Sequence, residues 1–329
     1  MRILVVNAGS SSLKLSLLDG DELVWSGSEL EQRADVDAIG HRIVHGGTEF
    51  VEPVVIDADV VRRIEALTDL APLHQPKSLR ALEQAGAAFP GVPAVACFDT
   101  AFHAHLPAAA ATYALPREWR KRWPLRRFGF HGLSHAYASR RAAELAGAGA
   151  RIITCHLGAG ASLAAVRNGR SVDTTMGFTP LEGLVMATRS GSVDPGLILW
   201  LEEHMGMPPS ELASTLEHRS GLLGLAGTSD MKAVLEAEAD GDEDAALAVA
   251  VYVHRLRGEI GRMAAALGAV DVLVFTGGVG ERSETIRARA CEGLGFLADA
   301  RVLVVEARED LEIARGVRSA LAFEDDEHG

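Results

Sequence analysis

The strongest constraint on the fold is an internal repeat. Its first copy, residues 2–20, reads RILVVNAGSSSLKLSLLDG, and its second, residues 151–169, reads RIITCHLGAGASLAAVRNG. The two align without a gap, and each has an apolar run, a loop of small residues, a second apolar run and a turn, which predicts a β-hairpin. Few identities survive, so chance is a rival explanation. Because the second copy begins near the midpoint of the chain, the repeat predicts a duplicated domain with one hairpin loop in each half.

The alternation of element types predicts an α/β protein. Short β-branched runs predict strands at 3–6, 13–18, 94–98, 152–155, 162–166, 271–275 and 302–305. Ala- and Leu-rich stretches predict helices at about 58–68, 77–88, 134–146, 195–205, 243–267, 283–293 and 308–320. The helix at 243–267 has the strongest signal, because acidic residues begin it, apolar residues recur every three or four positions and Gly268 follows it.

The net charge of −13 limits the possible partners. Nucleic acid and anionic membrane surfaces attract basic proteins, so neither is expected, and no apolar run approaches the roughly 18–20 residues of a membrane helix. Cys97, Cys155 and Cys291 form no C-x-x-C pair, which favours reduced thiols in a cytoplasmic protein. If the ligand is an anion, a few local cationic side chains and backbone N–H groups must attract it against the overall field.

The small-residue loops of the repeat are candidate phosphate-binding elements. Such loops allow a ligand to approach the backbone, where N–H groups and hydroxyls donate to phosphate oxygens. Neither loop has the Walker pattern, and for either loop alone an ordinary hairpin turn is the better explanation. Two matching loops favour a phosphate chain held between two domains. A third glycine cluster, residues 276–281, follows a predicted buried strand and precedes a helix expected to begin near Ser283.

Six motifs, in order along the chain, resemble the acetate/propionate kinase family. They are GHRIVHGG (40–47), FDTAFH (98–103), FGFHGLSH (128–135), HLGAGAS (156–162), MGFTPLEGLVMATRSGSVDP (176–195) and FTGGVGERS (275–283). The resemblance runs from residue 3 to about residue 315, and the block at 176–195 is its most specific part. This family belongs to the superfamily of acetate and sugar kinases, heat-shock ATPases and actin.

The resemblance implies a fold, a domain organisation and a reaction. The fold is a duplicated, ribonuclease-H-like (actin-like ATPase) α/β domain with an interdomain cleft. Residues 1–148 plus about 308–329 would form an acyl-substrate and metal domain, and residues 149–307 a nucleotide-binding domain. The implied reaction is the reversible, Mg²⁺-dependent transfer of the γ-phosphate of ATP to acetate, giving acetyl phosphate and ADP. Mn²⁺ is an alternative metal, and a homodimer is expected. The alternatives are propionate or another short-chain acid as substrate, or a non-catalytic nucleotide-binding relative.

The functional positions of the family fall on individual residues of this chain. The resemblance implies catalytic roles for Arg42, Asp99, His131 and Arg189, and metal-associated roles for Asn7 and Glu309, which the helix at 308–320 is expected to bring together. It implies that Arg42 also binds the substrate carboxylate and that the acyl pocket is lined by Val44, Leu73, Phe130 and Pro180. The implied nucleotide-binding residues are Ser10, Ser12, Lys14, His156, Leu157, Gly158, Ala159, Gly160, Asp230, Met231, Lys232, Gly278, Val279, Gly280, Glu281 and Arg282.

The implied chemistry needs these residue types. A carboxylic acid with a pKa of about 4–5 is already ionised at neutral pH, so no general base has to remove a proton. Transfer between two anions then depends on positioning and charge neutralisation, which two Arg, one His and Mg²⁺ supply. We expect Arg42 and Arg189 to grip the phosphoryl group from opposite sides while His131 donates to an equatorial oxygen. Asp99 would orient Arg42 or a metal-bound water.

Taken singly, these side chains have ordinary explanations. An Arg in a loop is usually a solvated charge and an isolated His is more often structural, so the assignment depends on the series of motifs. The i, i+4 pairs His41/His45 and His131/His135 could suggest zinc, but no Cys or acidic ligand accompanies them. Ser134 is expected to be the N-cap of a helix at 135–146, which leaves His131 outside that helix.

Four residues depart from the pattern of the family. Ala159 and Arg282 each stand where Asn is usual, Lys232 stands where Arg is usual, and Gln75 replaces the Asn of a P-L-H-N-P motif. The chain is also shorter than most members, with residues missing before Gly40 and between positions 300 and 301. These changes touch the nucleotide side more than the transfer centre. ATP, another nucleoside triphosphate and pyrophosphate therefore stay open as phosphoryl donors.

Overall fold

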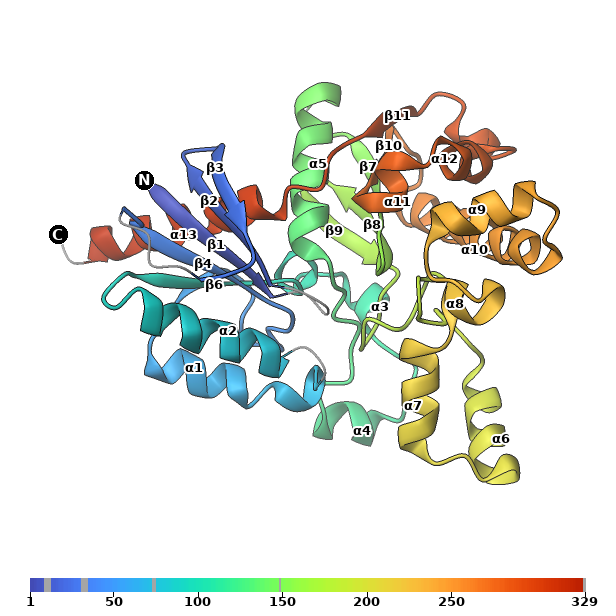
Figure 1. The fold of residues 1–329 in the computed structure, drawn as a ribbon, viewed down its shortest axis with the longest axis horizontal. Coiled ribbons are helices and arrows are strands. Elements are labelled where there is room, and N and C mark those ends of the chain that lie inside the picture. Colours follow the sequence, from blue (N-terminus) through green and yellow to red (C-terminus); the bar gives the residue numbers. More distant parts are fainter. Residues whose placement is uncertain (9–12, 31–34, 73–74, 148, 328–329) are drawn as a thin grey trace. The chain divides into compact units, whose positions relative to one another are not determined.

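The structure is a computed structural model that describes residues 1–8, 13–30, 35–72, 75–147 and 149–327, without the side chains of 323–327. The chain divides into two compact units, each built on one sheet (Figure 1). Unit 1 holds residues 1–104, 130–137 and 308–329, and unit 2 holds residues 105–129 and 138–307. These units differ from the predicted domains, because residues 105–129 and 138–148 group with unit 2. The predicted domains themselves stay a prediction.

The sheet of unit 1 has the strand order β3-β2-β1-β4-β6-β5. Strands β1, β2 and β3 form an antiparallel meander, whereas β4 and β6 run parallel to β1. The carboxyl ends of β1, β4 and β6 therefore lie at one edge of the sheet, where side chains from distant parts of the sequence can meet. The bounds are Arg2–Ala8 (β1), Leu13–Asp19 (β2), Glu22–Gly27 (β3), Ala38–Ile43 (β4), Val54–Val55 (β5) and Ala94–Phe98 (β6).

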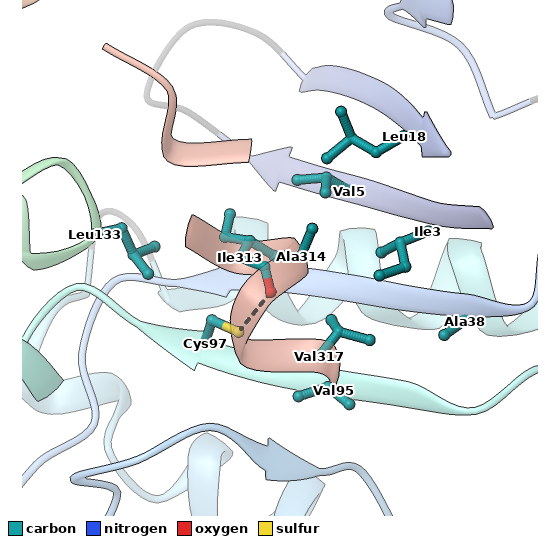
Figure 2. Close-up of a cluster of buried hydrophobic side chains, with 10 residues drawn as sticks. All are labelled: Ile3, Val5, Leu18, Ala38, Val95, Cys97, Leu133, Ile313, Ala314 and Val317. Carbon is teal, nitrogen blue, oxygen red and sulfur yellow. Dashed lines mark hydrogen bonds between the residues drawn. The ribbon is translucent and has the colours of Figure 1, made fainter. Parts of the chain in front are cut away.

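Helices cover both faces of this sheet. The C-terminal helix α13 packs against β1, β4 and β6, and Figure 2 shows Ile313, Ala314 and Val317 beside the strand residues Ile3 and Val95. The opposite face is covered by α1 and α2, whose buried side chains pack against β1, β4 and β6. Because α13 crosses the sheet, it brings the end of the chain back to the first strand. The bounds are Ala58–Glu65 (α1), Gln75–Ala88 (α2) and Glu309–Glu327 (α13).

The sheet of unit 2 repeats this arrangement in the strand order β9-β8-β7-β10-β11. Strand β7 pairs antiparallel with β8 and parallel with β10, as β1 does with β2 and β4. The predicted duplicated α/β fold is thus confirmed. The bounds are Arg151–Leu157 (β7), Ala161–Arg167 (β8), Arg170–Thr174 (β9), Val272–Thr276 (β10) and Arg301–Val304 (β11).

The two hairpins differ by one residue, so the gapless alignment of their second strands is wrong. The β1–β2 pairing leaves residues 9–12 between the strands, whereas the β7–β8 pairing leaves only residues 158–160. Each second strand then has a register shift against the third, at residues 17–18 in unit 1 and 165–166 in unit 2. The two shifts correspond once the second hairpin is taken as one residue shorter.

The longest helix, α10 (Glu243–Leu267), confirms the strongest helix prediction. The Asp242 side chain accepts a hydrogen bond from the amide of Ala245 at 2.8 Å, and Gly268 ends the helix with a φ of 80°. Its buried stripe packs against β7, β8 and β9. The helix therefore forms one layer of unit 2.

Shorter helices complete the chain, and several were not predicted. No helix within the described ranges is both long and apolar enough to cross a membrane. Strands β3, β4, β5 and β9 were also missed. The remaining bounds are Ala108–Ala111 (α3), Arg117–Arg122 (α4), Gly132–Ala146 (α5), Pro195–Met205 (α6), Pro209–His218 (α7), Gly221–Ala226 (α8), Met231–Ala239 (α9), Gly277–Arg282 (α11) and Glu284–Cys291 (α12), with short 3₁₀ turns at Thr68–Leu70, Ala101–His103 and Gly295–Leu297.

Candidate functional site

In unit 1, an ion pair links the carboxyl ends of two parallel strands. Arg42, in β4, donates from Nε to both carboxylate oxygens of Asp99 at 3.1 Å, and its Nη2 donates to Asp99 Oδ2. Asp99 follows β6 directly, and its side chain is only 1% exposed. The parallel register of β4 and β6 places these two residues side by side. The structure thus brings together two of the predicted catalytic residues.

Two further predicted residues join this pair. Arg42 Nη1 donates to Asn7 Oδ1 at 3.2 Å, and Asn7 Nδ2 donates to Glu309 Oε2 at 2.9 Å. Glu309 is the first residue of α13, so the crossing of that helix accounts for its place beside β1. Lys14 pairs with Asn7 across the β1–β2 ladder. Unit 1 therefore carries a polar cluster in which one guanidinium faces two carboxylates.

The electrostatics of the cluster follow from burial and charge. Burial would lower the pKa of Arg42, but the carboxylates of Asp99 and Glu309 outweigh that effect, and the pKa of Arg42 is raised. Burial raises the pKa of Asp99, and the guanidinium of Arg42 opposes this shift. Arg42 is therefore a permanent cation, and the cluster keeps an excess of acidic groups around it.

The donor atoms of this cluster fit a hard divalent cation. Glu309 offers a carboxylate that is 18% exposed, and Asn7 offers an amide oxygen, which are ligand types that Mg²⁺ takes. Within the described part of the chain, no group of three or more His, Cys, Asp or Glu is placed to hold a metal ion. The cluster thus suits a cation that is bound by one or two protein oxygens and completes its shell with water and phosphate.

His131 lies directly before α5, next to the same ion pair. Its carbonyl accepts the first hydrogen bond of the helix from the His135 amide at 2.9 Å, so the helix begins at Gly132. The predicted N-cap at Ser134 is wrong, because Ser134 is buried inside the first turn of α5. The Gly132 amide donates to the carbonyl of Asp99 at 2.9 Å, which ties the His131 segment to the ion pair.

The predicted acyl-pocket residues of unit 1 are apolar and buried. Val44 and Phe130 are 5% and 1% exposed, and the ring of Phe130 makes an edge contact with His45 at 5.6 Å between centroids. Leu73 lies outside the described residues, as do Ser10 and Ser12 of the first hairpin loop. For these three residues the implied roles stay predictions.

In unit 2, Arg189 lies in an irregular segment that contacts the loop carrying Pro180, a predicted acyl-pocket residue. Its Nη1 donates to the carbonyl of Pro180 at 3.1 Å and lies 3.7 Å from the sulfur of Met186. The amide of Ala187 donates to the carbonyl of Ala159 at 3.1 Å. The structure therefore links a predicted catalytic residue, Arg189, and a predicted substrate residue, Pro180, to the second hairpin loop.

The loop that carries Pro180 is held by a set of polar side chains. The Tyr113 hydroxyl donates to Glu182 at 2.6 Å and accepts from the Phe178 amide at 2.9 Å. Arg127 donates from Nη2 to Glu182 at 2.7 Å and from Nη1 to two loop carbonyls at 2.9 and 3.0 Å. These bonds fix the backbone of residues 175–182.

The third glycine cluster packs directly against the second hairpin. Residues 277–282 form the short helix α11, which was not predicted, and the helix expected to begin near Ser283 is confirmed as α12, which Ser283 caps by accepting from the Ile286 amide at 3.3 Å. Glu281 accepts hydrogen bonds from the amides of Gly277 and Ala307, both at 2.9 Å. Gly277 has a φ of 78°, and a Cβ there would lie 2.9 Å from the carbonyl oxygen of Leu157. The predicted nucleotide residues of these two segments are therefore neighbours.

The remaining predicted nucleotide residues lie at the start of α9. Asp230 caps this helix by accepting from the Lys232 amide at 3.0 Å, and Met231 is buried. The Lys232 side chain is 82% exposed and lies 3.7 Å from Glu236. This segment adjoins α8, whose Leu222 amide donates to the carbonyl of Met186 in the Arg189 segment.

The sequence analysis named the site residues but missed the residues that fix the backbone around them. His103 and Gly132 bind the backbone around His131 in unit 1. Arg127, Glu182 and Tyr113 shape the Pro180 loop in unit 2. His103, Gly132 and Glu182 lie inside the quoted motifs and Arg127 lies directly before one, which was the available signal. Tyr113 lies in none of them, and the spacing of these residues does not indicate their partners.

Comparisons with known proteins agree on one family. A sequence model of the acetokinase family matches residues 25–301. An acetate kinase from Synechococcus sp. (strain JA-2-3B'a(2-13)) is 42% identical over 405 aligned positions, which cover 98% of this chain and 100% of that protein. The crystal structure of Porphyromonas gingivalis acetate kinase has a TM-score of 0.90 at 34% identity and covers 97% of this chain and 99% of that one. A propionate kinase structure from Francisella tularensis has the same TM-score at 33% identity, with coverage of 97% and 99%.

Proposed function

Because this chain belongs to the acetokinase family, we propose that it transfers a phosphoryl group reversibly between ATP and the carboxylate of acetate. A carboxylate oxygen of acetate attacks the γ-phosphorus, the bond from that phosphorus to the β-phosphate oxygen breaks, and the products are acetyl phosphate and ADP. The observation that carries the proposal is the cluster of Arg42, Asp99, Asn7 and Glu309 at one edge of the unit 1 sheet.

The buried ion pair supports a role of Arg42 at the reacting anions. Asp99 binds the guanidinium through Nε and Nη2, and this fixes the plane of the fork. A fixed guanidinium binds carboxylate and phosphoryl oxygens without losing further side-chain entropy. Arg42 accordingly holds the acetate carboxylate and the transferring group, and Asp99 holds Arg42.

His131 and Arg189 are assigned to the charge that develops during transfer. His131 donates to an equatorial oxygen of the phosphoryl group, and Arg189 neutralises the same group from the nucleotide side. No proton has to be taken from the substrate, because acetate reacts as an anion. The Pro180 carbonyl, which accepts from Arg189 at 3.1 Å, orients that guanidinium.

The nucleotide and the metal complete the proposed site. Lys14, the loop at 156–160, helix α11 and the start of α9 bind ATP or ADP. Asn7 and Glu309 hold Mg²⁺, which supplies charge neutralisation at the phosphate oxygens when bound. Mn²⁺ takes the same kind of oxygen ligand, so a metal series in the assay distinguishes the two.

A cytoplasmic homodimer is part of the proposal. Its compartment is supported by the three cysteines, of which Cys97 and Cys155 are buried free thiols. The dimer is supported by helix α6, whose Leu197, Leu199 and Trp200 are each about half exposed to solvent. Light scattering of the wild type and of Leu199→Glu measures the mass, and equal masses would remove α6 from the interface.

A hydroxamate trap for acyl phosphate tests the proposed reaction. The purified chain is incubated with ATP, Mg²⁺, hydroxylamine and, in turn, acetate, propionate or butyrate. We expect acetyl hydroxamate to form fastest, because the similar proteins from Synechococcus sp. and Porphyromonas gingivalis are acetate kinases. A faster reaction with propionate would change the substrate, and no hydroxamate with any acid would overturn the proposal. Asp99→Asn run beside the wild type should lose most of the activity.

A further inference from the structure

The backbone of His131 adopts a conformation that few side chains other than glycine tolerate. Its φ is 56°, in the left-handed region, which costs free energy unless neighbouring bonds enforce it. In unit 1 the peptide groups on both sides of His131 are held by hydrogen bonds. The residues that make these bonds therefore hold the backbone from which the imidazole of His131 extends.

On the side before His131, the bond comes from a buried histidine with no role in the proposed reaction. His103 Nε2 lies 3.1 Å from the carbonyl oxygen of Phe130. A carbonyl oxygen only accepts, so Nε2 must carry the proton. The His103 side chain is fully buried, and its ring stacks edge-on to His135 at 5.6 Å, which fixes the direction of Nε2.

On the side after His131, the bond comes from the backbone of Asp99. The Gly132 amide donates to the Asp99 carbonyl at 2.9 Å, and a Cβ on Gly132 would collide with that same oxygen. His103 lies four residues after Asp99, in the 3₁₀ turn at Ala101–His103. One short segment, residues 99–103, thus grips the chain on both sides of His131.

We propose that His103 is a positioning residue, which sets the backbone of His131 through the Phe130 carbonyl and so aims the His131 imidazole at the phosphoryl group. This inference rests on the proposed function, because it deepens the role given there to His131. Without the bond from His103, the peptide between Phe130 and His131 loses the hydrogen bond that holds its carbonyl, while the bonds on the side after His131, from the Gly132 amide to Asp99 and from the His135 amide to the His131 carbonyl, remain. The substitution removes no side chain that is proposed to bind acetate or ATP, so binding should change less than turnover.

Two substitutions of His103 separate hydrogen bonding from packing. His103→Leu fills the space but removes the donor, whereas His103→Gln keeps an N–H group near the position of Nε2. We expect kcat of His103→Leu to fall about 30-fold or more while KM for acetate and for ATP changes less than about 3-fold. We expect His103→Gln to recover kcat to within about 5-fold of the wild type. A core variant on the α2 face, Phe89→Leu, serves as the control for general destabilisation.

A second measurement reads the hydrogen bond without any reaction. Nitrogen-15 spectra of histidine-labelled protein at neutral pH should show the ring of His103 with its proton on Nε2, exchanging slowly with solvent. The signal is assigned by its absence in His103→Gln. A proton on Nδ1, or fast exchange, would overturn the inference directly.

The outcomes of the kinetic series distinguish this inference from the proposed function. An active wild type with His103→Leu no worse than Phe89→Leu, or with His103→Gln as impaired as His103→Leu, overturns the positioning role alone. A wild type that makes no acyl hydroxamate overturns the proposed function, and the positioning role with it. A selective loss of kcat in His103→Leu, restored by His103→Gln, supports both.

Discussion

The two units share one sheet topology, but the side chains at the carboxyl ends of their corresponding strands differ in charge. Strand β1 pairs Ile3 with Ala38 of β4, and β7 pairs Ile152 with Val272 of β10. These registers, together with the repeat, make Arg42 and Thr276 equivalent positions. In unit 1 the strand ends in a charged side chain bound to a buried carboxylate, whereas in unit 2 it ends in a buried hydroxyl followed by glycine.

Under the proposed function, this difference would allow a duplicated fold to bind two different anions. At the unit 1 edge, side chains supply the charge, and the ion pair of Arg42 and Asp99 fixes its direction. At the unit 2 edge, Gly277 has a φ of 78° and lets the backbone of α11 lie against that of Leu157. The charged side chains at the unit 1 edge suit a small carboxylate, and the closely packed backbone at the unit 2 edge suits a chain of phosphates.

The largest effect should come from removing the charge at the unit 1 edge. Arg42→Ala leaves the Asp99 carboxylate, which is 1% exposed, without its guanidinium. We expect a loss of about 3–5 kcal/mol in the free energy of unfolding and of about 10³-fold or more in kcat. Arg189→Ala should lose kcat on a similar scale, but its removal leaves behind the Pro180 carbonyl, so the stability loss should be about 1–2 kcal/mol. Urea unfolding and the hydroxamate assay measure both quantities.

The double variant Arg42→Ala/Asp99→Ala sharpens this contrast. Removing both charges takes away the buried unpaired carboxylate, so we expect it to be more stable than Arg42→Ala alone while staying inactive. ATP affinity, measured by calorimetry, should be nearly kept in Arg189→Ala. Equal stability of Arg42→Ala and Arg189→Ala would contradict the view that the buried carboxylate of Asp99 depends on the guanidinium of Arg42.

A medium effect should come from substituting Gly277, which allows the close backbone contact at the unit 2 edge. Gly277→Ala combines a positive φ with a Cβ between 2.9 and 3.1 Å from backbone atoms of Leu157. We expect a loss of about 1–3 kcal/mol in stability and a rise of about tenfold in KM for ATP, with KM for acetate little changed. Thermal unfolding and initial rates measure these values.

The adjacent glycine is the matched control for stability. A Cβ on Gly278 meets no atom within 4 Å, and its φ is not positive, so Gly278→Ala should unfold within about 0.5 kcal/mol of the wild type. If the two alanine variants were equally stable, the close approach of α11 to Leu157 would not be what the glycine provides.

Elements with a clear local pattern could be predicted from the sequence, whereas elements whose pattern is interrupted could not. The repeat predicted a duplicated domain and the resemblance to the family implied its fold. Hydrophobic periodicity predicted the helix at 243–267, because periodicity is a local property. Strand β4 was missed, although it carries Arg42, because His41 and Arg42 interrupt its apolar pattern. The sequence also did not show that the second hairpin loop is one residue shorter than the first, because small residues fit a hairpin loop of either length.

The residues of the site were found by motif, and most of their mutual geometry came only with the tertiary structure. The bond between Asn7 and Glu309, which are 302 positions apart, confirms the expectation that the helix at 308–320 brings them together. That expectation came from the resemblance, because nothing in the local pattern at Glu309 indicates the crossing of α13. His103 and Gly132 were missed because a backbone carbonyl is their partner. Backbone partners leave no trace in the spacing of side-chain types.

At the other end of the central strands, the two units are nearly alike. The Asp37 carboxylate accepts from the amide of Arg2 at 2.7 Å, and the equivalent Asp271 accepts from the amide of Arg151 at 2.7 Å. Only in unit 2 does the guanidinium of the same arginine also bind that carboxylate, at 2.6 and 2.9 Å. In unit 1 the Arg2 side chain donates to Asp19 and Asp35 instead.

The smallest effect should come from this pair of aspartates. The hydrogen bonds from Arg151 lower the pKa of Asp271 to about 2, so its stabilising contribution is present above the unfolded value near 4 and is lost as the pH falls through about 2. Because the carboxylate is exposed, Asp271→Asn should lower the melting temperature by only about 1–2 °C at pH 7. The difference from the wild type should shrink toward pH 2, and carboxyl NMR titration measures the pKa directly.

Asp37→Asn tests whether the guanidinium, rather than the shared amide bond, makes the difference between the units. An asparagine oxygen still accepts from the backbone amide, so both variants keep that bond, and only Asp271→Asn loses a carboxylate bound by the side chain of its own arginine. We therefore expect Asp37→Asn to shift the melting temperature less than Asp271→Asn at pH 7. High salt should bring the two variants together, because it screens an exposed ion pair and leaves the amide bond intact. An equal shift in both variants at low salt would mean that the amide bond dominates and that the two strand beginnings are energetically the same.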